Sequence, residues 1–273
     1  MSDKSAIEWT DATWNPVTGC TKVSHGCKHC YAEREWPRLQ HLPAYTGRAF
    51  TDVRCHPERL EQPLRWTKPR RIFVNSMSDL FHEAVPNEYI DTVFAVMALA
   101  PQHTFQVLPK RPKRMLEYLS SNFLAHRIAR NMDDINVIRP TLQWPISNLW
   151  IGVSVEDQAT ADERIPLLLQ TPAAVRWVSA EPLLGPIDLR AATYGTGCER
   201  PSPTIQARQL ANPVAALDWV VAGGESGPKA RPSHPDWFRS LRDQCQAAGV
   251  PFFLKQWGEW ARVSMYEMGG YYM

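Results

Sequence analysis

The chain has 273 residues, of which 44% are hydrophobic and 21% are charged, with a formal net charge of +2. This length can bury a core as one large domain or two small ones, and the small net charge gives no global field that would demand a nucleic-acid partner. No apolar run of 18 residues marks a membrane span, and residues 1–10 lack the apolar stretch of a signal peptide. We therefore expect a cytoplasmic protein whose six cysteines are thiols or ligands rather than disulfides.

Strand-like and helix-like segments alternate along most of the chain. In chain order, apolar patterning and turn residues predict a strand at 71–76, a helix at 87–100, a strand at 104–108, a helix at 113–120, a strand at 149–155, a helix at 158–170, strands at 175–179 and 218–222, a helix at 235–248 and a strand at 251–254. Pro166 could break the third of these helices.

Connections this long are not hairpins, so the pattern predicts parallel βαβ units and an α/β fold. With one more strand near the N-terminus, we favour a full or partial parallel βα (TIM-like) barrel over an open doubly wound sheet. We expect a single domain over residues 1–273, with surface insertions at about 125–147 and 190–216, which are rich in Pro, Thr, Gln and Arg.

Polar residues follow the predicted strands, where parallel α/β folds gather functional groups. We expect Glu181, Glu225 and Lys255, which follow three different strands, to be catalytic residues. Helix caps and solvated loops are the alternative interpretation of these strand-end residues. The Gly-Gly pair before Glu225 lacks the pattern of a phosphate-binding loop, and such a pair more often lets backbone pass close to another element or ligand.

Three cysteines lie within eleven residues near the start of the chain, as Cys20, Cys27 and Cys30 in a C-x6-C-x2-C pattern. A C-x2-C pair is common in zinc sites, and His25, His29 or Cys55 could supply a fourth ligand. Three thiolates can also hold a [4Fe–4S] cluster and leave one iron open to a small molecule. The spacing alone leaves zinc and iron–sulfur both open.

Six sequence blocks carry a resemblance to a known family: WNPVTGCTKVSHGCKHCYAE, FVNSMSDLF, VLPKRP, GVSVED, SAEPLLGPID and GGESGPKARP with FFLKQWGEW. Together they resemble an uncharacterised phage and prophage protein family that has a cluster motif like that of the radical S-adenosylmethionine superfamily. The likeness runs from about Ile7 to Trp260.

The resemblance implies a partial βα barrel whose three cysteines bind a [4Fe–4S] cluster. In that superfamily the open iron chelates S-adenosylmethionine, and an electron, which a donor partner must supply, cleaves it to a 5′-deoxyadenosyl radical. The resemblance places His29 at the position of the aromatic residue near adenine, and it makes Ser76, Ser78 and Asp79 further candidates for cofactor binding.

Two features depart from the superfamily, whose usual spacing is C-x3-C-x2-C and whose Gly-Gly-Glu motif follows an early strand. Here the first gap is three residues longer, and Gly223-Gly224-Glu225 follows a late strand, so the role of that motif does not carry over. The phage resemblance and the basic residues Lys110, Arg111, Lys113 and Arg114 are consistent with a nucleotide or nucleic-acid substrate.

Two other functions compete with a radical enzyme. A zinc-stabilised nucleic-acid-binding protein would use the cysteines without catalysis. A metal-independent hydrolase would use Glu181 and Glu225 as an acid–base pair.

Overall fold

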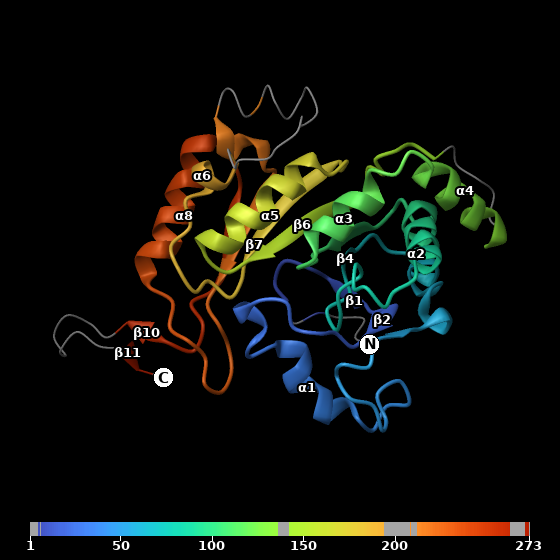
Figure 1. Cartoon of the computed structure of the whole chain (residues 1–273), viewed down its shortest axis with the longest axis horizontal. Helices are drawn as coiled ribbons and strands as arrows, with labels where there is room; N and C mark the ends of the chain where they lie inside the picture. Colours follow the sequence, from blue (N-terminus) through green and yellow to red (C-terminus); the bar gives the residue numbers. More distant parts are fainter. Residues whose placement is uncertain are drawn as a thin grey trace. The chain divides into compact units, whose positions relative to one another are not determined.

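A computed structural model of the chain describes residues 5, 7–135, 142–193, 208, 212–262 and 271–272 (Figure 1). The chain divides into two compact units. The first unit is made of Met1–Ile151 and Thr171–Val175, and the second of Gly152–Gln170 and Arg176–Met273.

The first unit contains a parallel sheet whose strands follow the order β1-β4-β5-β6. β1 pairs with β4, β4 with β5, and β5 with β6. The strands are β1 (Ala12–Trp14), β4 (Arg71–Val74), β5 (Thr104–Val107) and β6 (Leu149–Val155), and a separate antiparallel pair is formed by β2 (Val17–Thr18) and β3 (Arg54–Cys55). β1 is the additional strand expected near the N-terminus.

The second unit continues from the C-terminal half of β6, in the order β6-β7-β8-β9. β7 pairs with β8 and β8 with β9, both in parallel. These strands are β7 (Val175–Ala180), β8 (Trp219–Gly223) and β9 (Phe252–Gln256), and β10 (Ala261–Arg262) pairs with β11 (Tyr271–Tyr272) near the C-terminus. The mixed α/β class with parallel strands is confirmed, and this strand order is compatible with the partial βα barrel.

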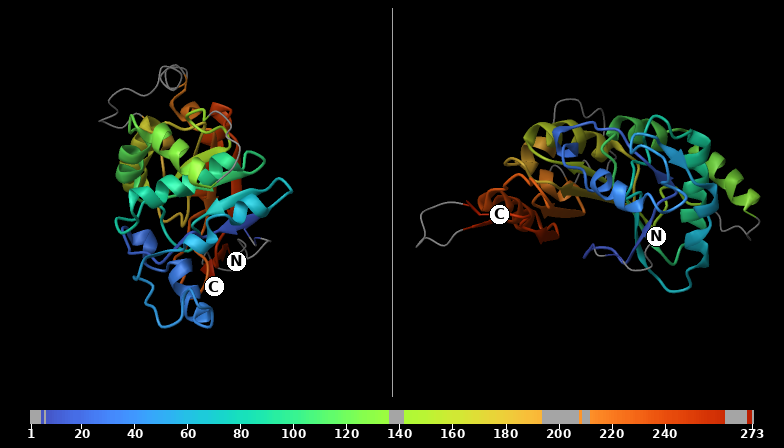
Figure 2. Two further views of the ribbon diagram at one scale, coloured as in Figure 1. Left: turned by 90° about the vertical axis from the view of Figure 1, so that its right-hand side faces the viewer. Right: turned by 90° about the horizontal axis from the view of Figure 1, so that it is seen from below.

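Helices connect successive strands of the sheet (Figures 1 and 2). They are α1 (Tyr31–Leu39), α2 (Asn87–Leu99), α3 (Pro112–Leu119), α4 (Leu124–Asp134), α5 (Gln158–Gln170), α6 (Leu189–Thr193) and α8 (Pro235–Ala248), with short 3-10 turns η1 (His25–Cys27), η2 (Pro57–Arg59), η3 (Gln62–Arg65) and η4 (Pro213–Ala216). None of the helices within the described ranges is both long and apolar enough to cross a membrane.

The predicted insertions partly coincide with helices. α4 lies in the first, where its apolar Ile128 and Met132 are buried and Arg127 Nε lies 3.0 Å from Asp91 Oδ2 of α2. α6 and η4 border the second, and residues 136–141, 194–207 and 209–211 of these ranges lie outside the described part of the chain.

Pro166 does not break α5, contrary to the sequence-based expectation. The helix runs from Gln158 to Gln170 with Pro166 in its interior. A proline at such a position costs about 3 kcal/mol, but Ile165, Leu168 and Leu169 are buried beside it. Burial of three large apolar side chains contributes about 1.5–3 kcal/mol each, so packing outweighs the local cost.

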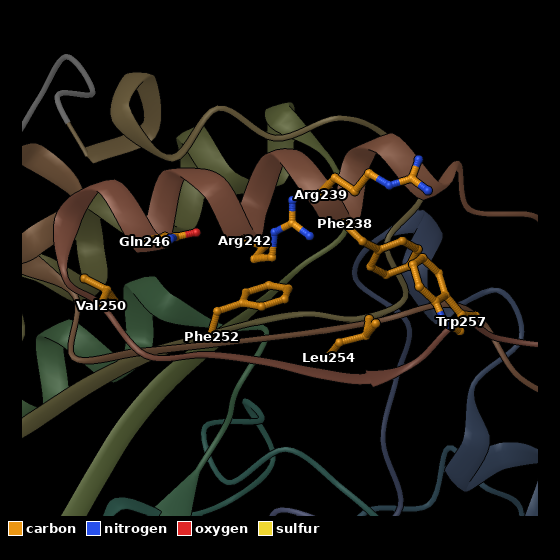
Figure 3. Close-up of a pocket in the computed structure, with 8 residues that line it drawn as sticks. All are labelled: Phe238, Arg239, Arg242, Gln246, Val250, Phe252, Leu254 and Trp257. Carbon is orange, nitrogen blue, oxygen red and sulfur yellow. The ribbon is translucent and has the colours of Figure 1, made fainter.

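α8 lies along β9 in the second unit and leaves a groove of about 630 Å³ between them (Figure 3). Phe252 and Leu254 of β9 form its apolar floor, and Arg239 and Arg242 project from α8. Both arginines already pair with aspartates of their own helix. The residues that line the groove include no thiol, carboxylate or hydroxyl, so it offers little chemistry beyond apolar contact.

Candidate functional site

In the first unit, backbone hydrogen bonds to two other segments of the chain hold Cys20 in place. Gly19 precedes it with φ +88°, and a Cβ there would lie 2.3 Å from the Asp52 carbonyl oxygen. The Gly19 N–H donates to Met77 O at 3.1 Å, and the Cys20 N–H donates to Phe50 O at 2.9 Å. Only glycine tolerates both the positive φ and the close approach, so Gly19 seats Cys20 beside the segment that follows β4.

Cys27 and Cys30 both lie just before the start of α1. Cys27 ends η1, and Cys30 is the residue that precedes the first turn of α1. The Ser24 hydroxyl lies 3.8 Å from Cys27 Sγ. Behind this segment Trp36 packs edge-on against Tyr45 and Phe50, with ring centroids 4.8 and 5.3 Å apart. The apolar face of α1 therefore anchors the two cysteines.

One cavity of about 160 Å³ in the first unit brings the three cysteines together. Cys20, Cys27 and Cys30 line it, and so do Ser76, Ser78 and Asp79 from the segment after β4. The remaining lining residues are Thr21, Val23, Tyr31, Ala32, Phe50, Leu108, Lys110 and Arg111. Five other residues that were predicted to bind a cofactor or metal thus share a cavity with Cys20. They are Cys27, Cys30, Ser76, Ser78 and Asp79, and the last of them is about 60 residues from Cys20 in the sequence.

Asn75 makes the turn that places Ser76, Ser78 and Asp79 there. It follows β4 with φ +62°, a left-handed conformation that Asn adopts more readily than most residues. Its amide oxygen accepts the Val17 N–H at 3.4 Å. The Ser76 hydroxyl donates a hydrogen bond to Asn15 Oδ1 at 3.2 Å, and the Ser78 hydroxyl donates to Val17 O at 2.9 Å. The two serines are therefore held to the segment that leads into Cys20.

Asp79 acts as an organising carboxylate in this cavity wall. Its side chain is 6% exposed. Oδ1 accepts the Phe81 N–H, and Oδ2 accepts the Lys110 N–H, both at 2.9 Å. Oδ2 also lies 3.3 Å from Arg111 Nη1. Asp79 therefore ties the loop after β4 to the loop after β5.

Burial keeps two of the thiols protonated when no metal is bound. Burial, with the negative charge of Asp79 adding to it, raises the pKa of Cys20 to about 11. Burial also raises the pKa of Cys30, against the N–H groups of Glu33 and Ala32, which stabilise its thiolate. Because metals bind thiolates, these N–H groups and Arg111 favour the form of each thiol that a metal would require.

His29 and Cys55, two candidates for a fourth zinc ligand, do not line the cavity, and neither does His25. Cys55 lies in β3, where it pairs with Val17. Within the described ranges, no three His, Cys, Asp or Glu side chains converge as they would on a single metal ion. The placement expected for His29 stays a prediction from the resemblance.

His56 supports the strand that leads to Cys20. Its side chain is 2% exposed, its Nε2 lies 2.7 Å from Thr18 Oγ1 and its Nδ1 lies 3.0 Å from Glu58 Oε1. Burial, together with the positive charge of Arg59, lowers the pKa of His56 to about 4.

We expect this histidine to make the protein less stable as the pH falls from about 6.5 toward 4. In that range the unfolded chain binds a proton that the folded chain does not, so the free energy of unfolding falls by up to about 1.4 kcal/mol per pH unit. Urea unfolding at pH 6.5, 5.5 and 5.0 would measure this slope. The slope should be smaller in His56→Gln, and an equal slope in both proteins would contradict the assignment.

The basic residues after β5 are not a solvated patch. Arg111 is 7% exposed. Arg114 donates to the backbone carbonyls of His82 and Val85 and to Asn87 Oδ1. Two of the four basic side chains, Arg111 and Arg114, therefore hold the fold together.

Glu181 and Lys255 meet in the second unit, as two of the three predicted catalytic residues. Lys255 Nζ lies 3.0 Å from Glu181 Oε1, and the Ser179 hydroxyl donates to Oε2 at 2.8 Å. A Cβ at Gly223 would lie 2.3 Å from Glu181 Oε1, so this glycine makes room for the carboxylate. The side chains of the pair are 16% and 26% exposed, and they form a polar cluster at the C-terminal ends of β7 and β9.

Glu225 has a different environment from Glu181. Its side chain is 4% exposed, and it forms an ion pair with Arg231. Oε2 accepts both the backbone N–H and the Nε–H of Arg231, at 2.8 and 2.9 Å. These contacts close the loop between the two residues. Within the described residues the structure gives Glu225 a loop-holding contact and pairs Glu181 with Lys255 instead.

Sequence reasoning missed the contact between Arg111 and the cysteines. The guanidinium reaches from the end of β5 to Cys20 Sγ, at 3.6 Å from Nη1. A usable signal existed, because Asp79 and Arg111 follow neighbouring parallel strands, where opposite charges can pair. The contact with Cys20 could not be predicted, because Cys20 and Arg111 are 91 residues apart in the sequence.

The model of the family described as "Protein of unknown function (DUF5131)" matches residues 4–271. No curated protein and no solved structure matches the chain significantly.

Proposed function

The chain belongs to this family of unknown function, and we propose that it is a radical S-adenosylmethionine enzyme that binds a [4Fe–4S] cluster through Cys20, Cys27 and Cys30. The observation that carries the proposal is that three thiols line one cavity whose described lining residues include no fourth cysteine and no histidine, while its one carboxylate, Asp79, is held by Arg111 and two backbone N–H groups. A structural zinc site uses four protein ligands, whereas a cluster with three cysteines keeps one iron for a small molecule.

The donor set of the cavity fits such a cluster. Three sulfurs are the only kind of protein ligand required, and each thiolate binds a different iron, so the sulfurs need not converge on one point as they would on zinc. The Ala32 and Glu33 N–H groups favour the Cys30 thiolate, and Arg111 donates to Cys20. When bound, the cluster would supply the electron that cleaves S-adenosylmethionine.

The other residues of the cavity have roles that follow from their contacts. Asp79, Ser76 and Ser78 hold the part of the cavity wall that follows β4, and Lys110 adds a cation to the lining. The aromatic ring of Tyr31, which is 55% exposed, stands at the edge of the cavity. A nucleotide or nucleic-acid substrate stays a prediction, as do the electron donor and the catalytic roles of Glu181, Glu225 and Lys255.

Metal and sulfide analysis after anaerobic reconstitution tests the proposal. We expect the wild-type chain to bind about four irons and four sulfides, with a brown colour and a broad absorption band. Cys27→Ala should lose most of this iron, because one of three ligands is gone. Cys55→Ser is the matched control, since it removes a thiol that lies outside the cavity, and it should load like the wild type.

The reaction itself is tested on the loaded protein by adding dithionite and S-adenosylmethionine. Release of 5′-deoxyadenosine from the wild type, and not from Cys27→Ala, is expected. A colourless wild-type protein that binds one zinc, with a lower zinc content in Cys27→Ala, would contradict the proposal. That result would favour the zinc-stabilised binding protein.

A further inference from the structure

The guanidinium of Arg111 is fixed in one orientation because all of its N–H groups have acceptors. Nε donates to the Glu83 carboxylate at 3.0 Å. Nη1 donates to Asp79 Oδ2 at 3.3 Å and to Cys20 Sγ at 3.6 Å. Nη2 donates to Thr21 O at 3.2 Å and to Thr21 Oγ1 at 2.9 Å. An arginine has five such donors, so no other rotamer would keep this set.

This contact differs from those of the other two cysteines. Cys27 lies near a neutral hydroxyl and Cys30 near backbone N–H groups. The charged neighbours of these two thiols, Lys22 and Glu33, pair with each other, and their side chains are 48% and 39% exposed. Cys20 receives its hydrogen bond from a fixed positive charge whose side chain is 6% exposed. A charge in such a site acts strongly on its neighbours, because little water screens it.

We propose that Arg111 is a positioning residue that holds Cys20 Sγ in the cavity wall and makes a cluster bound there easier to reduce. The inference rests on the proposed function. An oxidised [4Fe–4S] core with three thiolates carries a net charge of about −1, and one electron from an external reductant makes it about −2. A positive charge at the sulfur stabilises the second state more than the first.

The carboxylates around Arg111 have the opposite effect, because a negative charge near the cluster makes it harder to reduce. Asp79 is buried against the same guanidinium, and its charge disfavours the Cys20 thiolate. Glu83 is 69% exposed and is therefore screened by solvent. Removal of the Arg111 charge leaves Asp79 unbalanced beside Cys20, whereas removal of the Asp79 charge leaves Arg111 in place.

Redox titration of the reconstituted full-length chain tests this inference, with dithionite as the reductant and electron paramagnetic resonance as the readout. We expect the midpoint potential to shift to more negative values in Arg111→Lys, which keeps a charge but loses the fork of donors, and further in Arg111→Met. Asp79→Asn removes the negative charge, keeps one of the two acceptor oxygens, and should shift the potential to more positive values. Glu83→Gln is the control and should shift it least.

Iron content separates this inference from the proposed function. If the wild type binds no iron, both fall together. If wild type and variants bind equal iron but Arg111→Lys and Asp79→Asn leave the potential unchanged, the role of Arg111 is overturned while the proposed function stands. If Arg111→Met does not fold, Arg111→Lys and Asp79→Asn still test the inference, because we expect them to shift the midpoint potential in opposite directions. A merely structural effect has no reason to shift the potential in opposite directions in these two variants.

Discussion

Replacing Arg164 with methionine is expected to lower the free energy of unfolding by about 3–5 kcal/mol. Arg164 and Glu156 form an ion pair in the second unit, with side chains 3% and 0% exposed. Nη1 lies 3.3 Å from both Glu156 oxygens, and it donates to Ser154 O at 2.7 Å. The variant would leave a carboxylate without its counter-charge in a site that excludes water, which is the costly state.

The double variant Glu156→Leu with Arg164→Met is the matched comparison. Because it removes both charges and leaves apolar groups of similar size, it should recover most of the stability that the single variant loses. Urea unfolding followed by fluorescence would measure all three proteins at pH 7. A loss below about 1 kcal/mol in Arg164→Met, the range of an exposed pair, would show that the pair is solvated.

Replacing Gly224 with alanine is the second change with a large expected effect, about 3 kcal/mol or more of lost stability. A Cβ at this position would lie 2.0 Å from the Trp257 carbonyl oxygen and 2.9 Å from the Gly258 nitrogen. Both contacts are with backbone, so no change of rotamer relieves them. The end of β9 and the turn at Gly258, with φ +92°, would have to move.

Gly223→Ala is the control for that prediction. The Cβ at Gly223 meets the Glu181 carboxylate, the far end of a side chain that can rotate away. We expect a smaller loss of stability together with a broken Glu181–Lys255 pair. Thermal unfolding of both variants measures the difference, and equal losses would mean that the backbone approach at Gly224 relaxes easily.

The regular elements were largely readable from the sequence because their signals are local. The ten predicted strands and helices fall within about two residues of their expected bounds, and α5 and α8 match at both ends. The helices α1, α4 and α6 were not predicted. The Gly-Gly pair was rightly taken as a close approach of backbone, here to Trp257. The expected break at Pro166 failed because burial of the rest of α5 is a tertiary effect that no local rule contains.

The site was only partly readable, for the same reason. Cys20, Cys27 and Cys30 are near one another in sequence, and the polar residues after β4 could be placed at a strand end. Whether a polar strand-end residue faces a cavity, closes a loop or pairs in the core is decided by distant partners. Glu156 pairs with Arg164, and Glu225 closes a loop with Arg231.

By itself the sequence determined the α/β class, the order of its elements and the cysteine spacing, since each depends on periodicity or on residues a few positions apart. Only the tertiary structure decided that Ser76, Ser78 and Asp79 share a cavity with the three thiols. It also decided that Arg111, which the sequence suggested as one of four basic residues for an anionic substrate, is buried against Cys20. Parallel strands bring their ends together across many tens of residues, and the resulting contacts leave no local trace in the chain.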